Sequence, residues 1–556
     1  MTRLELAQGL LTGLLVSLLM TGAARAWPGQ VVAELDSPTR YPAGLASDGE
    51  SLYVVDWRRG RIHRVAPDDG RLLATIDAPT LKPQGLTWGG GRLYVSDGQT
   101  GTVFGIDPAS GAIESVFEGP GKQVSGLAWT SDGLLLLEGK SDKIYRVIPE
   151  DGTILDYFDA PTRSAGCLAH DGKYLWVSDR YRDELYVVDP KTGMVLGILP
   201  APGPYAAGVA WHDGKLWNVD FQTRKLYALQ VRGEQMYRLS EPRTARIEFA
   251  AVVYNYGPGE LRDLVVNLAL PETLPGQELL SEPRFASEPQ HIATDQWGQR
   301  CAVFTVDRLP AGQRFEAGYQ VQARISAISF LILPEMVGTL DEIPAELRAR
   351  YTIDGTRYRI GSPFIRKAVG EAVGDEHNAY WVARRIYEYI IERVEYEMIG
   401  GWDVPEVVLR RGSGSCSEYT FAYIAMCRAA GLPARYQGSV VVRGDDACVD
   451  DVFHRWAEVY LPNYGWVPVD PSRGDSPVPA ERCRGFGMLA NRFLITTRDG
   501  GDSELLGWDY NYHTRYRATG RAHVEQENLA FWEPLEEQTP PQPGKDAQLP
   551  VCRPKE

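Results

Sequence analysis

The segment "GSGSCSEYTFAYIAMCRAAGLPARY", residues 412–436, predicts a helix that begins at a cysteine. Ser415 and Glu418 form a Ser-x-x-Glu capping box before an apolar run, so Ser415 is the expected N-cap and Cys416 the first helical residue. Gly431, with a proline two residues later, is expected to end the helix. Unpaired N–H groups and the positive end of the helix dipole stabilise a thiolate at this position and could stabilise an oxyanion. Cys416 is therefore a candidate nucleophile.

The segment "FHRWAEVYLPNYGWVPVD", residues 453–470, predicts two strands joined by the turn "PNYG". If the hairpin pivots near Asn463, Asp470 falls opposite a residue close to His454, and the carboxylate can reach the imidazole. A thiol nucleophile needs a base, and the base needs an orienting group. Cys416, His454 and Asp470, in that chain order, are the candidate catalytic residues.

Together with "VPVDPS", these two segments resemble the motifs of the transglutaminase-like superfamily of thiol enzymes, which share a papain-like core. The resemblance covers about residues 365–500. It implies that Cys416 is the nucleophile, His454 the general base and then acid, and Asp470 the group that holds the imidazole. Ser417 stands where transglutaminases proper carry tryptophan. No cofactor or metal is expected, since no carboxylate cluster suited to calcium is evident in the sequence.

The second oxyanion donor stays open at this stage. Its four aromatic candidates are Tyr380, Trp381, Tyr396 and Trp402. An apolar stripe over residues 378–395 predicts an amphipathic helix.

The other cysteines of this region have simpler interpretations. Cys427 lies inside the helix and is expected to be a buried apolar residue. Cys448 and Cys483 flank the hairpin and could form a disulfide. The chain has seven cysteines, so at least one thiol is left over, and Cys416 is the candidate for it.

The first half of the chain repeats with an interval of 41 residues. A period near 40 with short β-rich segments and turn residues is typical of a propeller with one four-stranded sheet per repeat. "GQVVAEL", residues 29–35, matches the outer strand that the last repeat lacks, so this N-terminal strand is expected to close a ring of five blades. Six blades is the alternative, if neighbouring sequence supplies a degenerate one. The repeated segments end at Asp56, Asp97, Glu138, Asp179 and Asp220.

These repeats resemble the NHL and YVTN type of β-propeller. The resemblance implies a platform that binds a protein or glycan partner or, less often in such propellers, a metal-dependent lactonase. The five acids in register are expected to be turn residues bonded to backbone N–H groups, because a structural role recurs in every blade and a site need not.

The chain is expected to be an exported multidomain protein. The start has an apolar run and an Ala-x-Ala pattern typical of a signal peptide, which implies a periplasmic or secreted protein with no membrane span after cleavage. The net charge of -15 argues against nucleic-acid partners. The expected parts are the signal peptide (1–26), an all-β propeller (27–235), an immunoglobulin-like β-sandwich (236–360), an α+β papain-like transglutaminase core (361–535) and a disordered Pro-rich tail (536–556).

The expected function is that of a thiol enzyme acting on a protein or peptide substrate through a thioester, with hydrolysis favoured over transfer to an amine. The substrate bond is a peptide bond or a glutamine amide, and the propeller positions the substrate. The main alternative is an exported binding protein in which the propeller recognises a partner and the thiol domain is a scaffold.

Overall fold

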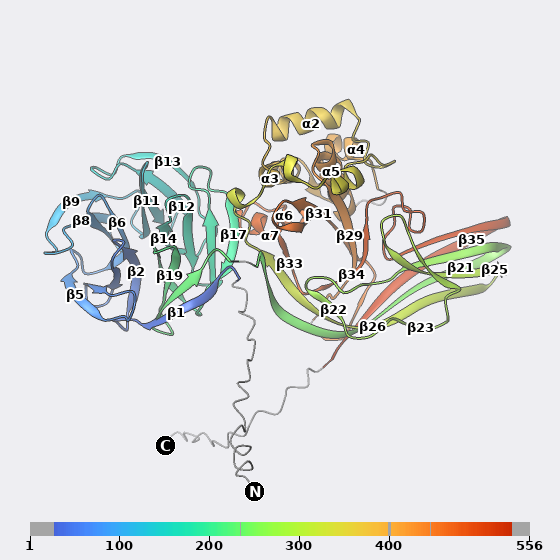
Figure 1. Cartoon of the computed structure of the whole chain (residues 1–556), viewed down its shortest axis with the longest axis horizontal. Coiled ribbons are helices and arrows are strands. Elements are labelled where there is room, and N and C mark those ends of the chain that lie inside the picture. Colours follow the sequence, from blue (N-terminus) through green and yellow to red (C-terminus); the bar gives the residue numbers. More distant parts are fainter. Residues whose placement is uncertain (1–26, 234, 399–401, 445, 536–556) are drawn as a thin grey trace, which may run out of the picture.

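The computed structural model places three parts side by side (Figure 1). It describes residues 27–233, 235–398, 402–444 and 446–535. The predicted signal peptide and the predicted disordered tail lie outside these residues. Among the helices in the described ranges, none is long and apolar enough to cross a membrane.

Residues 27–233 form a propeller of five four-stranded antiparallel sheets. Its strands are β1 (Gln30–Asp36), β2 (Pro42–Ser47), β3 (Leu52–Asp56), β4 (Arg61–Val65), β5 (Leu72–Asp77), β6 (Pro83–Gly89), β7 (Arg92–Asp97), β8 (Thr102–Ile106), β9 (Ile113–Glu118), β10 (Val124–Thr130), β11 (Gly133–Glu138), β12 (Lys143–Val147), β13 (Ile154–Asp159), β14 (Ala165–His170), β15 (Leu175–Asp179), β16 (Glu184–Val188), β17 (Val195–Pro200), β18 (Ala206–His212), β19 (Lys215–Asp220) and β20 (Lys225–Gln230). Four blades use consecutive strands, and the fifth has the order β1-β20-β19-β18. The N-terminal strand therefore closes a five-bladed ring, as the repeat predicted.

The recurring acids have the predicted turn role in every blade. Each ends the second strand of its sheet, and its carboxylate accepts hydrogen bonds from backbone N–H groups of the following turn. Asp56, for example, accepts from the N–H groups of Arg58 and Arg59 at 3.2 and 2.9 Å. These buried carboxylates are used to stabilise the turns.

A nine-stranded sheet occupies the region of the predicted sandwich and takes strands from beyond it. Its strands are β21 (Tyr237–Ala269), β22 (Gln277–Leu279), β23 (Arg284–Phe285), β24 (His291–Thr294), β25 (Arg300–Leu309), β26 (Gln313–Phe330), β30 (Cys448–Asp450), β33 (Met488–Leu489) and β35 (Tyr512–Pro534). One edge of β21 pairs with β26 and then with β25. The other edge pairs with β35 along almost the whole length of β35. The predicted boundary at residue 360 therefore does not separate the two domains, because β35 returns to the sheet from the far end of the chain.

In the third part, helices cover a four-stranded sheet of order β32-β31-β29-β34. Its elements are η1 (Pro334–Met336), η2 (Leu340–Glu342), α1 (Ala345–Tyr351), α2 (Pro363–Val373), α3 (Ala379–Ile391), β27 (Glu395–Tyr396), α4 (Pro405–Arg411), β28 (Ser413–Gly414), α5 (Cys416–Ala429), β29 (Ala434–Val441), β31 (His454–Leu461), β32 (Gly465–Val469), α6 (Pro471–Gly474), α7 (Pro479–Arg484) and β34 (Phe493–Asp499). The predicted helices are observed as α3 and α5. Helix α5 is buried on all sides and packs on β31 and β29.

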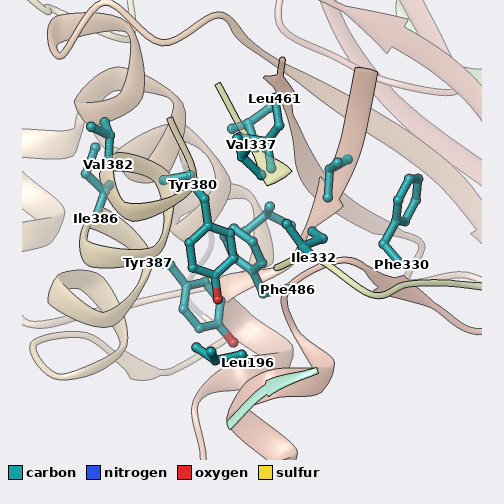
Figure 2. Close-up of a cluster of buried hydrophobic side chains, with 14 of the residues drawn as sticks. Leu196, Phe330, Ile332, Val337, Tyr380, Val382, Ile386, Tyr387, Leu461 and Phe486 are labelled. Carbon is teal, nitrogen blue, oxygen red and sulfur yellow. The ribbon is translucent and has the colours of Figure 1, made fainter. Parts of the chain in front are cut away.

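One apolar core joins the three parts. Figure 2 shows Leu196 of the propeller strand β17 beside Tyr387 of α3 and Phe486, with Phe330 of the nine-stranded sheet at the other side of the cluster.

A buried arginine also joins the propeller to α3. The guanidinium of Arg384 forms an ion pair with Glu388, one helical turn further along α3, and donates a hydrogen bond to the carbonyl of Val195 in β17. The propeller is thus packed onto the helical domain through buried side chains.

Candidate functional site

Cys416 is the first residue of α5, as the capping box predicted. The carboxylate of Glu418 accepts the N–H of the N-cap residue Ser415 at 2.8 Å, and it also accepts from the guanidinium of Arg411 at 2.8 Å. Glu418 is fully buried, so these contacts hold the start of the helix in one conformation. Cys416 lies at the helix end where backbone N–H groups have no intrahelical partner.

His454 and Asp470 meet at the ends of two paired strands. His454 begins β31, and Asp470 follows β32 and is the N-cap of α6. The imidazole Nε2 lies 2.7 Å from Asp470 Oδ2. The other oxygen, Oδ1, accepts from the Ser472 hydroxyl at 2.7 Å and from the Arg473 N–H at 3.2 Å. Both carboxylate oxygens are therefore held, and the carboxylate fixes the orientation of the ring.

The Cys416 thiol completes the arrangement, since the His454 side chain lies close enough to lower the pKa of the thiol. Because Nε2 is used by Asp470, the nitrogen that faces the sulfur is Nδ1. The backbone N–H of Arg455 also lowers the pKa of this thiol. The structure thus brings together all three residues singled out in the sequence, and their catalytic role stays a prediction.

The charges of these groups favour an ion pair. Burial raises the pKa of the Cys416 thiol, but the hydrogen bond and charge of His454 outweigh it and leave this pKa lowered. Burial alone lowers the pKa of His454, whereas the negative charge of Asp470 raises it to about 10. Burial likewise raises the pKa of Asp470, and the His454 charge more than reverses that effect. At neutral pH this pattern favours a thiolate beside an imidazolium.

Two aromatic rings pack against the imidazole. The ring centroids of Trp456 and Phe493 lie 5.7 and 5.5 Å from that of His454, with interplanar angles of 28° and 29°. The His454 side chain keeps an exposed fraction of 19%. Trp456 lies two residues after His454 on β31 and so on the same face of the strand, whereas Phe493, which the sequence analysis missed, reaches the site from β34. No local pattern marks that residue.

Arg455, which follows the histidine, is fully buried and was not singled out in the sequence. Its guanidinium carbon lies 4.3 to 4.7 Å from four ring centroids, those of Trp402, Phe421, Tyr436 and Tyr510. Its Nη2 donates to the Trp508 carbonyl at 2.8 Å, and it forms no ion pair with any residue that the structure describes. Arg455 holds the first residues of β31, and hence its own N–H, beside the sulfur.

Tyr396 has the clearest link to the site among the four candidate oxyanion donors. Burial, followed by the charges of Cys416 and Asp470, raises the pKa of its phenol. Tyr380 is instead fully buried in the core shared with the propeller. Trp402 packs over the guanidinium of Arg455. Trp381 remains a candidate that no contact with the thiol supports.

The remaining thiols of the domain are structural. Burial raises the pKa of Cys427, which is completely enclosed, as predicted. Cys448 and Cys483 are both free, so the suggested disulfide between them is not formed. Cys448 lies on β30 and pairs with β35, whereas Cys483 lies in α7 against the propeller. Within the described ranges, no group of three His, Cys, Asp or Glu side chains is placed to hold a metal ion.

Comparison with known proteins agrees with this geometry. Residues 366–471 match the family model of the transglutaminase-like superfamily. An uncharacterized protein from Haemophilus influenzae is 26% identical over 25% of this chain and 45% of its own length. A protein-glutamine gamma-glutamyltransferase from Pseudomonas aeruginosa is 27% identical over 25% of this chain and 23% of its own length.

The chain therefore spans less than half the length of either curated relative. A solved structure of a candidate cysteine protease from Cytophaga hutchinsonii has 15% identity and a TM-score of 0.38, and covers 55% of this chain and 95% of its own. The helical part of the protein, around residues 366–471, is a domain of the transglutaminase-like superfamily of thiol enzymes, joined here to a five-bladed β-propeller.

Proposed function

We propose that the protein is an exported thiol hydrolase that cleaves amide bonds of peptides or of glutamine side chains. The observation that carries this proposal is the relation of three groups: Cys416 at the start of α5, the His454 side chain that lowers the pKa of its thiol, and Asp470 at 2.7 Å from the imidazole Nε2. A binding scaffold would not require this arrangement.

The reaction uses only groups in this arrangement. The Cys416 thiolate attacks the amide carbonyl carbon, and the backbone N–H of Cys416 donates to the oxyanion that forms. The His454 imidazolium gives its proton to the nitrogen of the leaving amine, the C–N bond breaks, and a thioester remains. A water molecule then loses a proton to His454 and attacks the thioester. The acid leaves, and the thiolate and imidazolium are restored.

Transfer to an amine is the second candidate, and the name of the Pseudomonas aeruginosa relative favours it. Hydrolysis is supported by the partial exposure of His454, which leaves the imidazole accessible to water. A glutamine-containing peptide incubated with and without a fluorescent primary amine separates the two. Release of ammonia or peptide cleavage without the amine supports hydrolysis, whereas product formation only with the amine supports transfer.

The thiol chemistry itself is tested by iodoacetamide labelling of Cys416 as a function of pH. Wild type should label well below the ordinary thiol pKa of about 8.5, and His454→Ala should not. His513→Ala is the matched control, because His513 also contacts a carboxylate, that of Asp509, away from the thiol. Labelling that follows an ordinary thiol titration in wild type would show that no thiolate–imidazolium pair exists, and the binding-protein alternative would replace this proposal.

A further inference from the structure

The end of the propeller axis holds a cavity of about 450 Å³ that the thiol chemistry does not use. Residues of all five blades line it, at the end where each blade's first strand begins and its second strand ends. We call it the propeller funnel. Its volume is in the range of sites that take small ligands or a few side chains of a peptide.

The lining of the propeller funnel departs from the repeat. The acid that ends each second strand recurs in every blade, but the residue directly after it lines the funnel and changes from blade to blade. In blade order these residues are Trp57, Gly98, Gly139, Arg180 and Phe221. A structural role requires the same residue type in every blade, whereas a ligand requires different groups at different places. The variation therefore indicates a binding site.

The charged residues of this lining are two arginines, both on the fourth blade. Arg163 and Arg180 line the funnel, no carboxylate of the described residues does, and the chain as a whole has a net charge of -15. Neither guanidinium forms an ion pair with a residue in the described ranges, although Arg180 lies over the Tyr181 ring at 5.1 Å. The nearby carboxylate of Asp179 accepts hydrogen bonds from its own turn and from two hydroxyl groups. The two guanidiniums are thus available to a bound anion.

The next two blades around the ring, the fifth and the first, supply aromatic side chains. Trp57 of the first blade faces the funnel together with Tyr205 and Phe221 of the fifth, and the last two rings have centroids 5.3 Å apart. Gln84 and Gln123 supply amide groups from the second and third blades. One side of the funnel therefore suits a carboxylate, another suits a flat apolar side chain, and the amides between them suit a peptide backbone.

We propose that the propeller funnel binds an acidic peptide segment, with a carboxylate at Arg163 and Arg180 and a neighbouring aromatic or apolar side chain on the ring wall. The choice of a peptide over an acidic glycan rests on the proposed function, since the thiol site is suited to amides. An ion pair also connects the propeller funnel to the thiol domain. Arg182, in the same turn as Arg180, pairs with Glu481 of α7, a helix that follows Asp470 closely in the sequence.

The proposal is tested by binding, without turnover, on the full mature chain carrying Cys416→Ser. The probes are the fluorescein-labelled peptide Gly-Phe-Asp-Asp-Phe-Gly and its uncharged counterpart Gly-Phe-Asn-Asn-Phe-Gly, followed by fluorescence anisotropy. The acidic peptide should bind saturably, and the uncharged one at least about tenfold more weakly, which is about 1.4 kcal/mol. The Arg163→Gln/Arg180→Gln double variant should bind the acidic peptide about tenfold more weakly than the parent protein does, and its affinity for the uncharged peptide should not change.

The matched control is Arg61→Gln/Arg71→Gln, which removes the same charge from exposed arginines on the first blade. It should bind like the parent protein, and thermal melting checks that each variant is folded. Three results would overturn the proposal: no saturable binding, equal binding of both peptides, or equal loss in the control variant. Tighter binding of an oligouronate than of the acidic peptide would support an anion site at the two arginines but would reject a peptide as its ligand. Because no step needs a reactive thiol, these failures are distinct from failure of the proposed hydrolysis.

Discussion

His454 donates from Nε2 to Asp470 Oδ2 at 2.7 Å, and this contact decides which ring nitrogen serves the thiol. The carboxylate has a lowered pKa and is an acceptor at neutral pH, so the proton on Nε2 stays between the two groups. Nδ1 is left to exchange a proton with Cys416. The direction of proton transfer in the proposed reaction follows from this pairing.

Replacing Asp470 by asparagine should slow the reaction without unfolding the protein. The amide keeps the shape of the carboxylate but removes the charge that raises the pKa of His454, so less imidazolium and less thiolate exist at neutral pH. We expect a loss of roughly 10⁴-fold in kcat/KM, by analogy with the same substitution in the Ser-His-Asp triad. The rate of iodoacetamide labelling at pH 6 to 7 should fall in parallel. Asp509→Asn, which removes a carboxylate from His513, should change neither.

The ionised pair of Cys416 and His454 should also change how the free energy of unfolding depends on pH. His454 has a folded pKa near 10, above its unfolded value of about 6.5, so its contribution is present below pH 6.5 and lost as pH rises towards 10. Cys416 has a lowered folded pKa, so its contribution is present above the unfolded value of about 8.5 and lost as pH falls.

The two opposing dependences nearly cancel between about pH 6.5 and 8.5, because one proton is bound by the pair in both states. Urea unfolding of wild type and of the Cys416→Ser/His454→Gln double variant, which lacks both titrating groups, across pH 5 to 10 measures the difference. The difference should be flat in that window and shrink on either side. A difference that rises steadily with pH would contradict a preformed thiolate–imidazolium pair.

Arg455 should matter for packing more than for charge. Removing the side chain in Arg455→Ala opens a cavity among four rings, and we expect a loss of about 3 kcal/mol in the free energy of unfolding. Arg455→Met refills most of that space and removes a buried, unpaired charge, so it should recover most of the loss. Equal destabilisation by both substitutions, measured by urea unfolding, would show that the attraction between the guanidinium and the four rings contributes more to stability than the packing of the side chain does.

The long strand β35 should stabilise the nine-stranded sheet through Trp532, which has an exposed fraction of 2% and pairs with Ile247 of β21. Trp532→Ala should lower the free energy of unfolding by about 3 to 5 kcal/mol. The neighbouring Phe531 points to the other face and is 46% exposed, so Phe531→Ala should change it by about 0.5 kcal/mol or less. Similar losses from both variants would indicate that β35 does not lie with this face inward.

Local patterns in the sequence were sufficient for the repeat, the closing strand, the start of α5 and the order of the three candidate residues. Each depends on groups close together in the chain or on a regular period, such as the capping box of Ser415 and Glu418 or the 41-residue interval. The hairpin of β31 and β32 is also local, and its register placed Asp470 near His454 correctly.

Only the tertiary structure decided the features that join distant segments. The pairing of β35 with β21, the packing of Phe493 on His454 and the rings around Arg455 bring together residues that no short pattern connects. The same holds for the propeller funnel, whose lining comes from five blades. The sequence by itself determined which side chains can do chemistry and where their helix and strands begin. Their surroundings were decided by packing, because the energy of burial depends on which surfaces meet in the folded chain.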